Sequence, residues 1–486
     1  MPAAGQPPRV LMLSQDLVGP QMAGPGIRYW ELARVLAQTC RVTLAAPLAA
    51  TMSERERPAL SFALAPLTLE RAEELTPLLA EADVVVSNGF LLYQYPQLAQ
   101  GSLPWVVDAY IPSPTEGLAY YHAYPLAEQE AAHRGNLAVL KRIFQRGDFF
   151  LCASERQRDL YMGLLAAAGR LNPHTYAQDP TLRQLIDVVP FGLSSTPPVK
   201  RRAVLKGVQP GLSPQTRVIL WGGGIWDWLD PLTLIRAVAQ LVRQGQDVCL
   251  YFPGTRHPFQ ERVPDMEMRR RAVALSDSLD LTGRQVFFGD WTPHEERGNY
   301  LLEADIGVSL HRPGVEARYA FRTRVLDYLW AGLPMLVSTG DSLAEMIAAR
   351  GLGYAVESED VPGVTSALAR LLAEPDARER RQAAFQAAAQ EYTWERVARP
   401  LVAFCQQPAL AADRHAGYQA APADERPTAN VQELVAAQQR ADTLEQQLLT
   451  TQQRATEWQQ LAEQYEQGRF MRLMAAIRRW RARLGV

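Results

Sequence analysis

The chain has 486 residues, of which 47% are hydrophobic and 21% charged, and its formal net charge is -2. A chain of this length exceeds what one hydrophobic core supports, so we predict two domains of ordinary size plus further segments. The ordinary composition and near-zero net charge exclude a chain-wide attraction to nucleic acid or to membranes, so any basic feature must be local.

Residues 9–193 alternate short apolar runs with stretches of helical periodicity. Apolar runs separated by helices are typical of parallel strands that are buried on both faces. We therefore predict a doubly wound, Rossmann-like α/β domain over residues 1–197. The runs are RVLMLSQ, RVTLAAP, ADVVVSNG, LPWVVDAY, DFFLCASE and IDVVPFGL.

A second series of the same kind follows a polar, proline-bearing segment, SSTPPVKRRAVLKGVQPGLSPQ, where both periodicities lapse. We place the domain boundary there and predict a second doubly wound domain over 198–405. Its apolar runs are TRVILWGGG, QDVCLYFPG, RQVFFGDW, ADIGVSLH and LPMLVSTG, and its helices are expected at 230–243, 264–279, 295–303 and 322–331.

Ligands of open α/β sheets bind beyond the carboxyl ends of the strands, so two such domains predict a shared cleft. In the first domain Gly24 and Gly26 precede a helix that carries Arg28, which suits an anion at the helix N-terminus. A flexible loop explains these glycines equally well. In the second domain Gly223 and Gly224 end a strand, so a phosphate could approach the backbone there.

Two tryptophans follow this second glycine loop. Trp226 and Trp228 flank Asp227, and they either stack a sugar or close the domain interface. Asp230 and Pro231 then start a helix, as a cap and a first-turn residue.

The stretch HRPGVEARYAFRTRVLDYLWAGLPMLVS at 311–338 crowds charge at the start of an apolar helix. Arg322 and Arg324 oppose the helix dipole, so something negative is expected to compensate them, and a diphosphate suits guanidinium groups. Asp327, one turn further on, could accept hydrogen bonds from a ribose. The alternative is pairing within the segment, of Arg324 with Asp327 and of Glu316 with Arg318.

These features resemble the GT-B glycosyltransferases, in particular family 4 of retaining enzymes that use nucleotide sugars. The resemblance covers residues 1–402 and is most specific over 300–338, in YLLEADIGVSLHRP and VLDYLWAGLPML. YTWERVARPLVAF resembles the terminal helix that crosses back onto the first domain, with Trp394 as its anchor. The resemblance implies an acceptor-binding first domain and a donor-binding second domain.

The resemblance also implies roles for single residues of the second domain. Asp327 stands at the second glutamate of the family's acidic motif, which binds the ribose. Glu316 resembles the first, which contacts the donor sugar, but lies 11 residues before Asp327 where the family has 8. The family's phosphate-binding arginine and lysine after the first strand of this domain are missing, so Arg322 and Arg324 are expected to replace them.

Further roles concern the base and the acceptor. The loop after VFFGDW implies a pocket for the base at Asp290, Trp291 and Thr292, although Trp291 suits core packing equally. Asp108 and Glu116, in VVDAYIPSPTE after a strand, are expected to orient the acceptor or the transferred sugar. The predicted catalytic residues are Glu316 and Asp108.

We expect no metal and no cofactor besides the donor. The DxD pattern of metal-dependent transferases is not evident, and arginines with helix termini can carry the phosphate charge. A GT-B phosphorylase would need a lysine in the second domain for pyridoxal phosphate, and no lysine follows Lys206.

The C-terminal part reads as three segments. Residues 406–429 are rich in Ala and Pro and predict a flexible linker. Residues 430–467 carry a heptad seam that predicts a coiled coil, which makes a homodimer, binds a partner helix or lies back on the chain. The seam is Leu434, Ala437, Ala441, Leu444, Leu448, Thr451, Ala455, Trp458, Ala462 and Tyr465.

Residues 468–486 predict a basic amphipathic helix, suited to an anionic membrane surface or to an acidic partner. The N-terminus shows no signal peptide, no apolar run is long enough to span a bilayer, and the four cysteines form no CxxC pair. We therefore expect a cytoplasmic protein, peripheral at the inner face of the plasma membrane.

The function predicted from these observations is transfer of a sugar from a nucleotide-diphosphate donor to a glycan or lipid-linked acceptor in cell-surface polysaccharide synthesis. Two alternatives stay open: a non-catalytic GT-B scaffold that assembles a complex through its coiled coil, and a sugar-nucleotide epimerase. Nucleic acid is not an expected partner.

Overall fold

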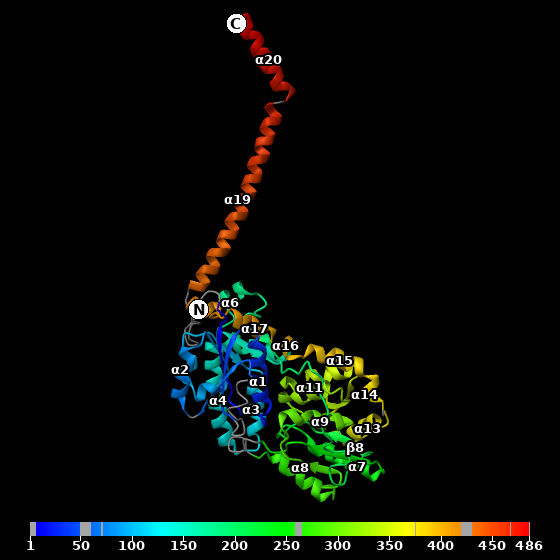
Figure 1. Cartoon of the computed structure of the whole chain (residues 1–486). Helices are drawn as coiled ribbons and strands as arrows, with labels where there is room; N and C mark the ends of the chain where they lie inside the picture. Colours follow the sequence, from blue (N-terminus) through cyan, green and yellow to red (C-terminus); the bar gives the residue numbers. More distant parts are fainter. Residues whose placement is uncertain are drawn as a thin grey trace. The chain divides into compact units, whose positions relative to one another are not determined.

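The computed structural model describes residues 6–48, 60–69, 71–257, 265–374, 376–418, 430–466 and 468–485. The chain forms two compact units, Met1–Gln419 and Ala420–Val486. The first unit contains two α/β domains, coloured from blue to cyan and from green to yellow in Figure 1.

The first domain is built on a sheet of seven strands in the order β3-β2-β1-β4-β5-β6-β7. All its strand pairs are parallel, with Val10 opposite both Val42 and Val84. This pattern is the predicted doubly wound sheet. The strands are Arg9–Leu13, Arg41–Ala46, Ala63–Pro66, Val84–Asn88, Trp105–Asp108, Phe149–Cys152 and Ile186–Val188 for β1 to β7. The helices are α1 Gly24–Leu36, α2 Leu75–Ala80, α3 Ser113–Tyr121, α4 Leu126–Arg146, α5 Glu155–Ala167 and α6 Pro173–Gln178, with 3-10 turns η2 Ala72–Glu74, η3 Gly89–Tyr93 and η4 Pro96–Ala99.

The second domain has six parallel strands in the order β10-β9-β8-β11-β12-β13. The strands β8 to β13 are Arg217–Leu220, Val248–Phe252, Val286–Phe288, Ile306–Ser309, Met335–Ser338 and Gly353–Val356. The helices are α7 Pro231–Arg243, α8 Glu267–Ser278, α9 Arg297–Glu303, α10 Val315–Tyr319, α11 Thr323–Trp330, α12 Ser342–Ala349, α13 Val361–Leu372, α14 Ala377–Arg380, α15 Gln382–Glu391, α16 Trp394–Val397 and α17 Arg399–Gln406, with η5 His294–Glu296.

The inner strands are largely buried, as their apolar sequence predicts, and β4, β6 and β9 are buried at every residue. The strands that the sequence did not predict, β3 and β13, lie at sheet edges and contain no fully buried residue. Because edge strands bury less, they lack the continuous apolar run that identifies an inner strand. The segment at 312–321, which precedes the helix expected at 322–331, contains the short helix α10.

The helices after residue 393 return to the first domain. Trp394 is 1% exposed and its ring lies 4.8 Å from that of Phe191. Its amide donates to the carbonyl of Leu193, and a Cβ at Gly192 would lie 2.5 Å from its ring. On α17, Phe404 stacks on Phe149 of β6 at 4.9 Å. Trp394 therefore packs at the crossing, where the resemblance had placed it.

Residues 407–418, predicted as the start of a flexible linker, are instead fixed on the first domain. Within α18, Ala412–His415, the buried carboxylate of Asp413 accepts hydrogen bonds from Arg170 (Nε, 2.6 Å) and Asn172 (Nδ2, 3.0 Å). The amide of Ala411 donates to Asp148 at 2.8 Å. The error arose because these partners lie more than 200 residues earlier in the chain. The rest of the predicted linker, 419–429, lies outside the described residues.

Replacing Asp413 with alanine is expected to lower the free energy of unfolding by about 3–5 kcal/mol, because it leaves the buried Arg170 guanidinium without its counter-charge. Chemical denaturation of the variant measures this. Glu130→Ala serves as the matched control, since its pair with Arg134 is exposed and is worth about 1 kcal/mol or less. An equal loss in both variants would contradict the assignment.

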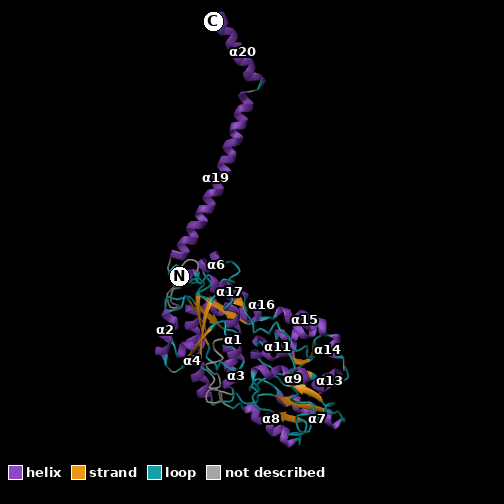
Figure 2. Cartoon of the chain, in the orientation of Figure 1, coloured by secondary structure: helices purple, strands orange, loops and turns teal. Residues whose placement is uncertain are grey.

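The described residues of the second unit form two helices, α19 Asn430–Glu466 and α20 Arg469–Leu484. Figure 2 shows both in the helix colour, in the segments predicted as a coiled coil and an amphipathic helix. Among the described residues, no helix is long and apolar enough to cross a membrane. Self-association of α19 stays a prediction.

Candidate functional site

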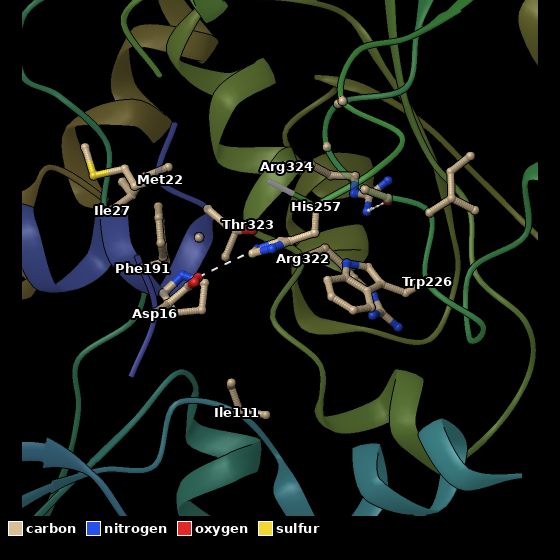
Figure 3. Close-up of a pocket in the computed structure, with 18 of the residues that line it drawn as sticks. Asp16, Met22, Ile27, Ile111, Phe191, Trp226, His257, Arg322, Thr323 and Arg324 are labelled. Atoms are coloured by element: carbon tan, nitrogen blue, oxygen red, sulfur yellow. Dashed lines mark hydrogen bonds and ion pairs between the residues drawn. The ribbon is translucent and has the colours of Figure 1, made fainter. Parts of the chain in front are cut away.

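A cavity of about 870 Å³ is lined by residues of both α/β domains. Its walls follow the carboxyl ends of the strands, with Asp16 after β1, Glu116 after β5 and Gly223 after β8. Figure 3 shows Met22 and Ile27 of the first domain across from residues of the second. Of the sequence-predicted site residues, the cavity is lined by Gly24, Glu116, Gly223, Gly224, Trp291, Thr292, Glu316, Arg322, Arg324 and Asp327.

The glycine loop after β8 is held in place by Tyr328, a residue that sequence reasoning missed. The amide of Gly222 donates to the Tyr328 hydroxyl at 2.6 Å, and that hydroxyl donates to the Val308 carbonyl at 2.8 Å. Burial raises the pKa of Tyr328 to about 12, so the hydroxyl keeps its proton. Gly223 has φ +88°, a left-handed conformation that favours glycine. The loop therefore presents a fixed backbone to the cavity.

Arg324 of α11 lines the cavity without an acidic partner among the described residues. Its Nη2 donates to the Gly224 carbonyl at 3.0 Å, and its guanidinium lies 4.9 Å from the Trp221 ring. Its buried Nη1 has no hydrogen-bond partner in the described part of the chain. Burial, with a smaller contribution from Arg322, lowers the pKa of Arg324 to about 10, while Tyr328 and Asp327 oppose the shift. A guanidinium in these surroundings favours an anionic ligand.

Arg322 is placed differently from the prediction. Its Nη1 and Nη2 donate to the two carboxylate oxygens of Glu316 at 2.9 and 2.6 Å, and both side chains are buried. The Glu316 carboxylate therefore balances the positive charge of Arg322, a role that the sequence had suggested for a bound phosphate. The predicted alternative of a Glu316–Arg318 pair is also wrong, because Arg318 is exposed beside Tyr319.

Asp327 faces Arg297 rather than Arg324. The Nε of Arg297 lies 3.4 Å from Oδ1 of Asp327. Burial raises the pKa of the Asp327 carboxyl, while Arg297 and Arg324 oppose the shift. Arg297 also lies over the Trp330 ring at 4.9 Å and contacts His294. Arg297 was not predicted; its position at the start of a helix after β10 was the available signal.

Glu116, at the start of α3, brings a second carboxylate toward this end of the cavity. Burial raises its pKa to about 7, Glu316 adds to the shift and Arg322 opposes it. The first domain therefore contributes an ionisable carboxyl group that faces the Glu316–Arg322 pair.

The raised pKa of Glu116 gives a pH-dependent effect on stability. A carboxyl group whose pKa is raised on folding lowers stability, because above pH 4.5 it ionises in the unfolded state while the folded protein still holds the proton. The loss of stability therefore grows between pH 4.5 and 7 and is complete above pH 7. Glu116→Gln is expected to raise the thermal unfolding temperature relative to wild type at pH 8, and to change it little at pH 4.5. An equal change in the thermal unfolding temperature at pH 4.5 and pH 8 would contradict this account.

Asp108 and Arg28 lie outside the cavity lining. They form a buried bidentate ion pair, with Nε to Oδ2 and Nη2 to Oδ1 both at 2.8 Å. Arg28 also donates to the carbonyls of Val189 and Pro190. This placement does not fit the predicted catalytic role of Asp108 or an anion-binding role of Arg28. The pair instead joins α1 and β5 to the end of β7.

Gly26 and Asp290 also lie outside the lining. A Cβ at Gly26 would lie 2.3 Å from the Leu17 carbonyl oxygen, so this glycine allows close packing of α1. The carbonyl of Asp290 accepts a hydrogen bond from the Gly254 amide. Trp291 and Thr292 do line the cavity, and the Trp291 ring lies 5.3 Å from the His257 ring.

Two further features of the lining are a contact between the two domains and a stacked pair of tryptophans. Asp16, directly after β1, lies 3.8 Å from Nε2 of His257, which follows β9 (Figure 3). Both residues lie in loops that follow strands, which was the available signal in the sequence. Trp226 and Trp228 stack with ring centroids 5.4 Å apart and both line the cavity. Within the described residues, no group of three or more His, Cys, Asp or Glu side chains could hold a metal ion.

Comparison with known proteins agrees with this architecture. Residues 216–374 match the family described as glycosyl transferases group 1. Sucrose-phosphate synthase from Thermosynechococcus elongatus has a similar structure, with a TM-score of 0.61 and 18% identity over 82% of this chain and 98% of that one.

The chain has the GT-B fold. WaaG, a glycosyltransferase involved in lipopolysaccharide biosynthesis, superposes with a TM-score of 0.56 and 15% identity over 82% of this chain and 100% of that one. HepE of Anabaena, solved with UDP-glucose, superposes with a TM-score of 0.58 and 12% identity, also over 82% of this chain and 100% of that one. No curated protein matches the sequence. The GT-B architecture predicted from the sequence is confirmed, and the second domain carries a glycosyl transferases group 1 match.

Proposed function

We propose that the protein transfers a sugar from a nucleotide-diphosphate donor to a glycan or lipid-linked acceptor, by the retaining chemistry of family 4. The observation that carries the proposal is Arg324, a cavity-lining arginine without an acidic partner in the described residues. It lies beside the Gly222–Gly224 loop that Tyr328 fixes. Together they form a preorganised site for a diphosphate.

In this proposal the leaving diphosphate lies between Arg324 and the glycine loop. Fixed donors stabilise the negative charge that develops as the glycosidic bond breaks, and they need no reorganisation during the reaction. Arg322 acts differently from the sequence prediction: by pairing with Glu316 it orients that carboxylate in the cavity wall. Glu316 then positions the sugar, and Asp327 with Arg297 binds the ribose and the adjoining phosphate.

Other residues of the cavity lining suit the base, the sugar ring and the acceptor. Trp291 and Thr292 suit a base pocket, and the stacked pair of Trp226 and Trp228 offers a flat surface to a sugar ring. Glu116 lies on the acceptor-side domain and is proposed to orient the acceptor hydroxyl. The proposal needs no metal ion, since guanidinium and amide groups carry the phosphate charge.

The proposal is tested by incubating the full chain with UDP-glucose and with the GDP, ADP and dTDP sugars while measuring nucleotide release. Release above the uncatalysed rate, lost in Glu316→Gln, would support transfer chemistry with water as a substitute acceptor. Binding without release of any nucleotide would instead favour the scaffold. Interconversion of the sugar without release would favour the epimerase.

The described part of α19 carries exposed apolar side chains at the predicted heptad positions Leu444, Leu448 and Trp458. We propose that they pair with a second copy of the chain in a coiled coil. Sedimentation equilibrium of wild type against Leu444→Glu with Leu448→Glu tests this, and a monomeric wild type would contradict it.

A further inference from the structure

The helix α20 has a charge pattern unlike the rest of the chain. The full chain has a net charge of -2, yet α20 contains no aspartate or glutamate. Two of its arginines, Arg481 and Arg483, lie in the last turn, where they suit the helix dipole. The arginines are Arg469, Arg472, Arg478, Arg479, Arg481 and Arg483.

The same helix exposes large apolar side chains on one face. At 100° per residue, six of them fall within an arc of about 120° of the circumference. Phe470 is 72% exposed, Trp480 is 64% exposed and Leu473 is 58% exposed. Arg469 and Arg478 border this arc, and Arg472, Arg479 and Arg483 lie on the opposite side of the helix. Arg481 lies inside the arc near one edge, where its long side chain can extend along the surface to the border. The six residues in the arc are Phe470, Leu473, Met474, Ile477, Trp480 and Leu484, and Met471 lies outside it.

Different occupants of this surface would use different parts of it. A nucleic acid would pair with the arginines but leave the wide apolar face in water. An acidic protein helix would need a matching apolar groove as well as acids. The interface of an anionic bilayer uses both features, because the apolar face enters the acyl boundary and the arginines contact lipid phosphates.

We propose that α20 lies flat in the surface of an anionic phospholipid bilayer. Its 16 residues are about 24 Å long, which suits a helix that lies in the interface better than one that crosses it. Trp480 and Phe470 enter the headgroup boundary, as aromatic side chains do at membrane surfaces. This inference stands apart from the proposed transfer reaction, because α20 contributes no residue to the cavity lining.

The test is flotation of the full chain with vesicles of phosphatidylcholine mixed with phosphatidylglycerol, against vesicles of phosphatidylcholine alone. Wild type is expected to float with the mixed vesicles and to remain behind with the neutral ones. Each arginine that borders the apolar arc is expected to contribute about fivefold to the partition coefficient, so Arg469→Gln with Arg478→Gln lowers it about 25-fold at low salt. Arg440→Gln with Arg454→Gln, on α19, removes the same charge outside α20 and is expected to change it little.

A second variant tests the apolar face. Phe470→Ser, Ile477→Ser and Trp480→Ser together keep every arginine, and they are expected to abolish flotation. Retained flotation of this variant would overturn the proposal in favour of a purely electrostatic contact. The proposal would also be overturned if wild type floated equally well with neutral and mixed vesicles. The same holds if the arginine variants of α19 and α20 lowered the partition coefficient equally. Nucleotide binding, measured on the same preparations, is expected to be unchanged, so failure of the membrane proposal remains separable from failure of the transferase proposal.

Discussion

Replacing Arg324 with alanine is expected to lower kcat/KM for the nucleotide sugar by about 100-fold, because it removes a preorganised donor from the developing diphosphate charge. The Arg324 side chain lines the cavity, its Nη1 has no partner in the described chain, and its Nη2 is fixed by the Gly224 carbonyl. Steady-state kinetics of nucleotide release measures the effect. Arg324→Lys is expected to recover only part of the activity, because an ammonium group lacks the planar fork.

Arg324→Ala is expected to keep or slightly raise the thermal unfolding temperature. The guanidinium is buried in surroundings that lower its pKa, so its removal relieves a desolvation cost. Arg318→Ala, an exposed arginine of the same segment, is the matched control and is expected to change neither quantity. If Arg324→Ala lost stability and activity together, the arginine would be structural and the phosphate assignment would be wrong.

The second large effect concerns stability. Arg28→Ala is expected to lower the free energy of unfolding by about 3–5 kcal/mol, because it leaves the Asp108 carboxylate buried and unpaired. The carbonyls of Val189 and Pro190 lose a donor as well. Urea denaturation measures the loss, and Arg34→Ala on the same helix is the control, since its ion pairs are partly exposed.

The double variant Arg28→Met with Asp108→Leu separates the two interpretations of this pair. Apolar residues of similar size in place of a buried ion pair are expected to restore much of the stability. Nucleotide release by the refolded double variant would then confirm a structural role for Asp108. Restored stability with all activity lost would revive the catalytic role predicted from the sequence.

The sequence predicted the two sheets because inner parallel strands need continuous apolar runs. It also placed the glycine loop and the 311–338 segment at the ligand edge, since both follow strands. What it could not predict were the partners of charged residues. Arg28 and Asp108 are 80 residues apart, and Arg170 and Asp413 are 243 apart. Such pairs depend on the tertiary fold, and no local spacing indicates them.

The contacts within the site also depend on the tertiary fold, so the sequence did not predict them. Arg322 and Glu316 are only six residues apart, but their pairing depends on α10, which the sequence did not indicate. The role of Tyr328 was hidden because its partners Leu220 and Val308 belong to β8 and β11, which lie side by side only in the folded sheet.

The central claim is that the cavity binds a nucleoside diphosphate through Arg324 and Asp327. Calorimetric titration of UDP, GDP, ADP and dTDP into the full chain, into Arg324→Ala and into Asp327→Ala tests it most directly. The account predicts selective binding of one nucleotide by wild type, weakened in both variants and unchanged in Arg318→Ala. Absence of binding for all four nucleotides, or equal affinity in wild type and Arg324→Ala, would contradict it.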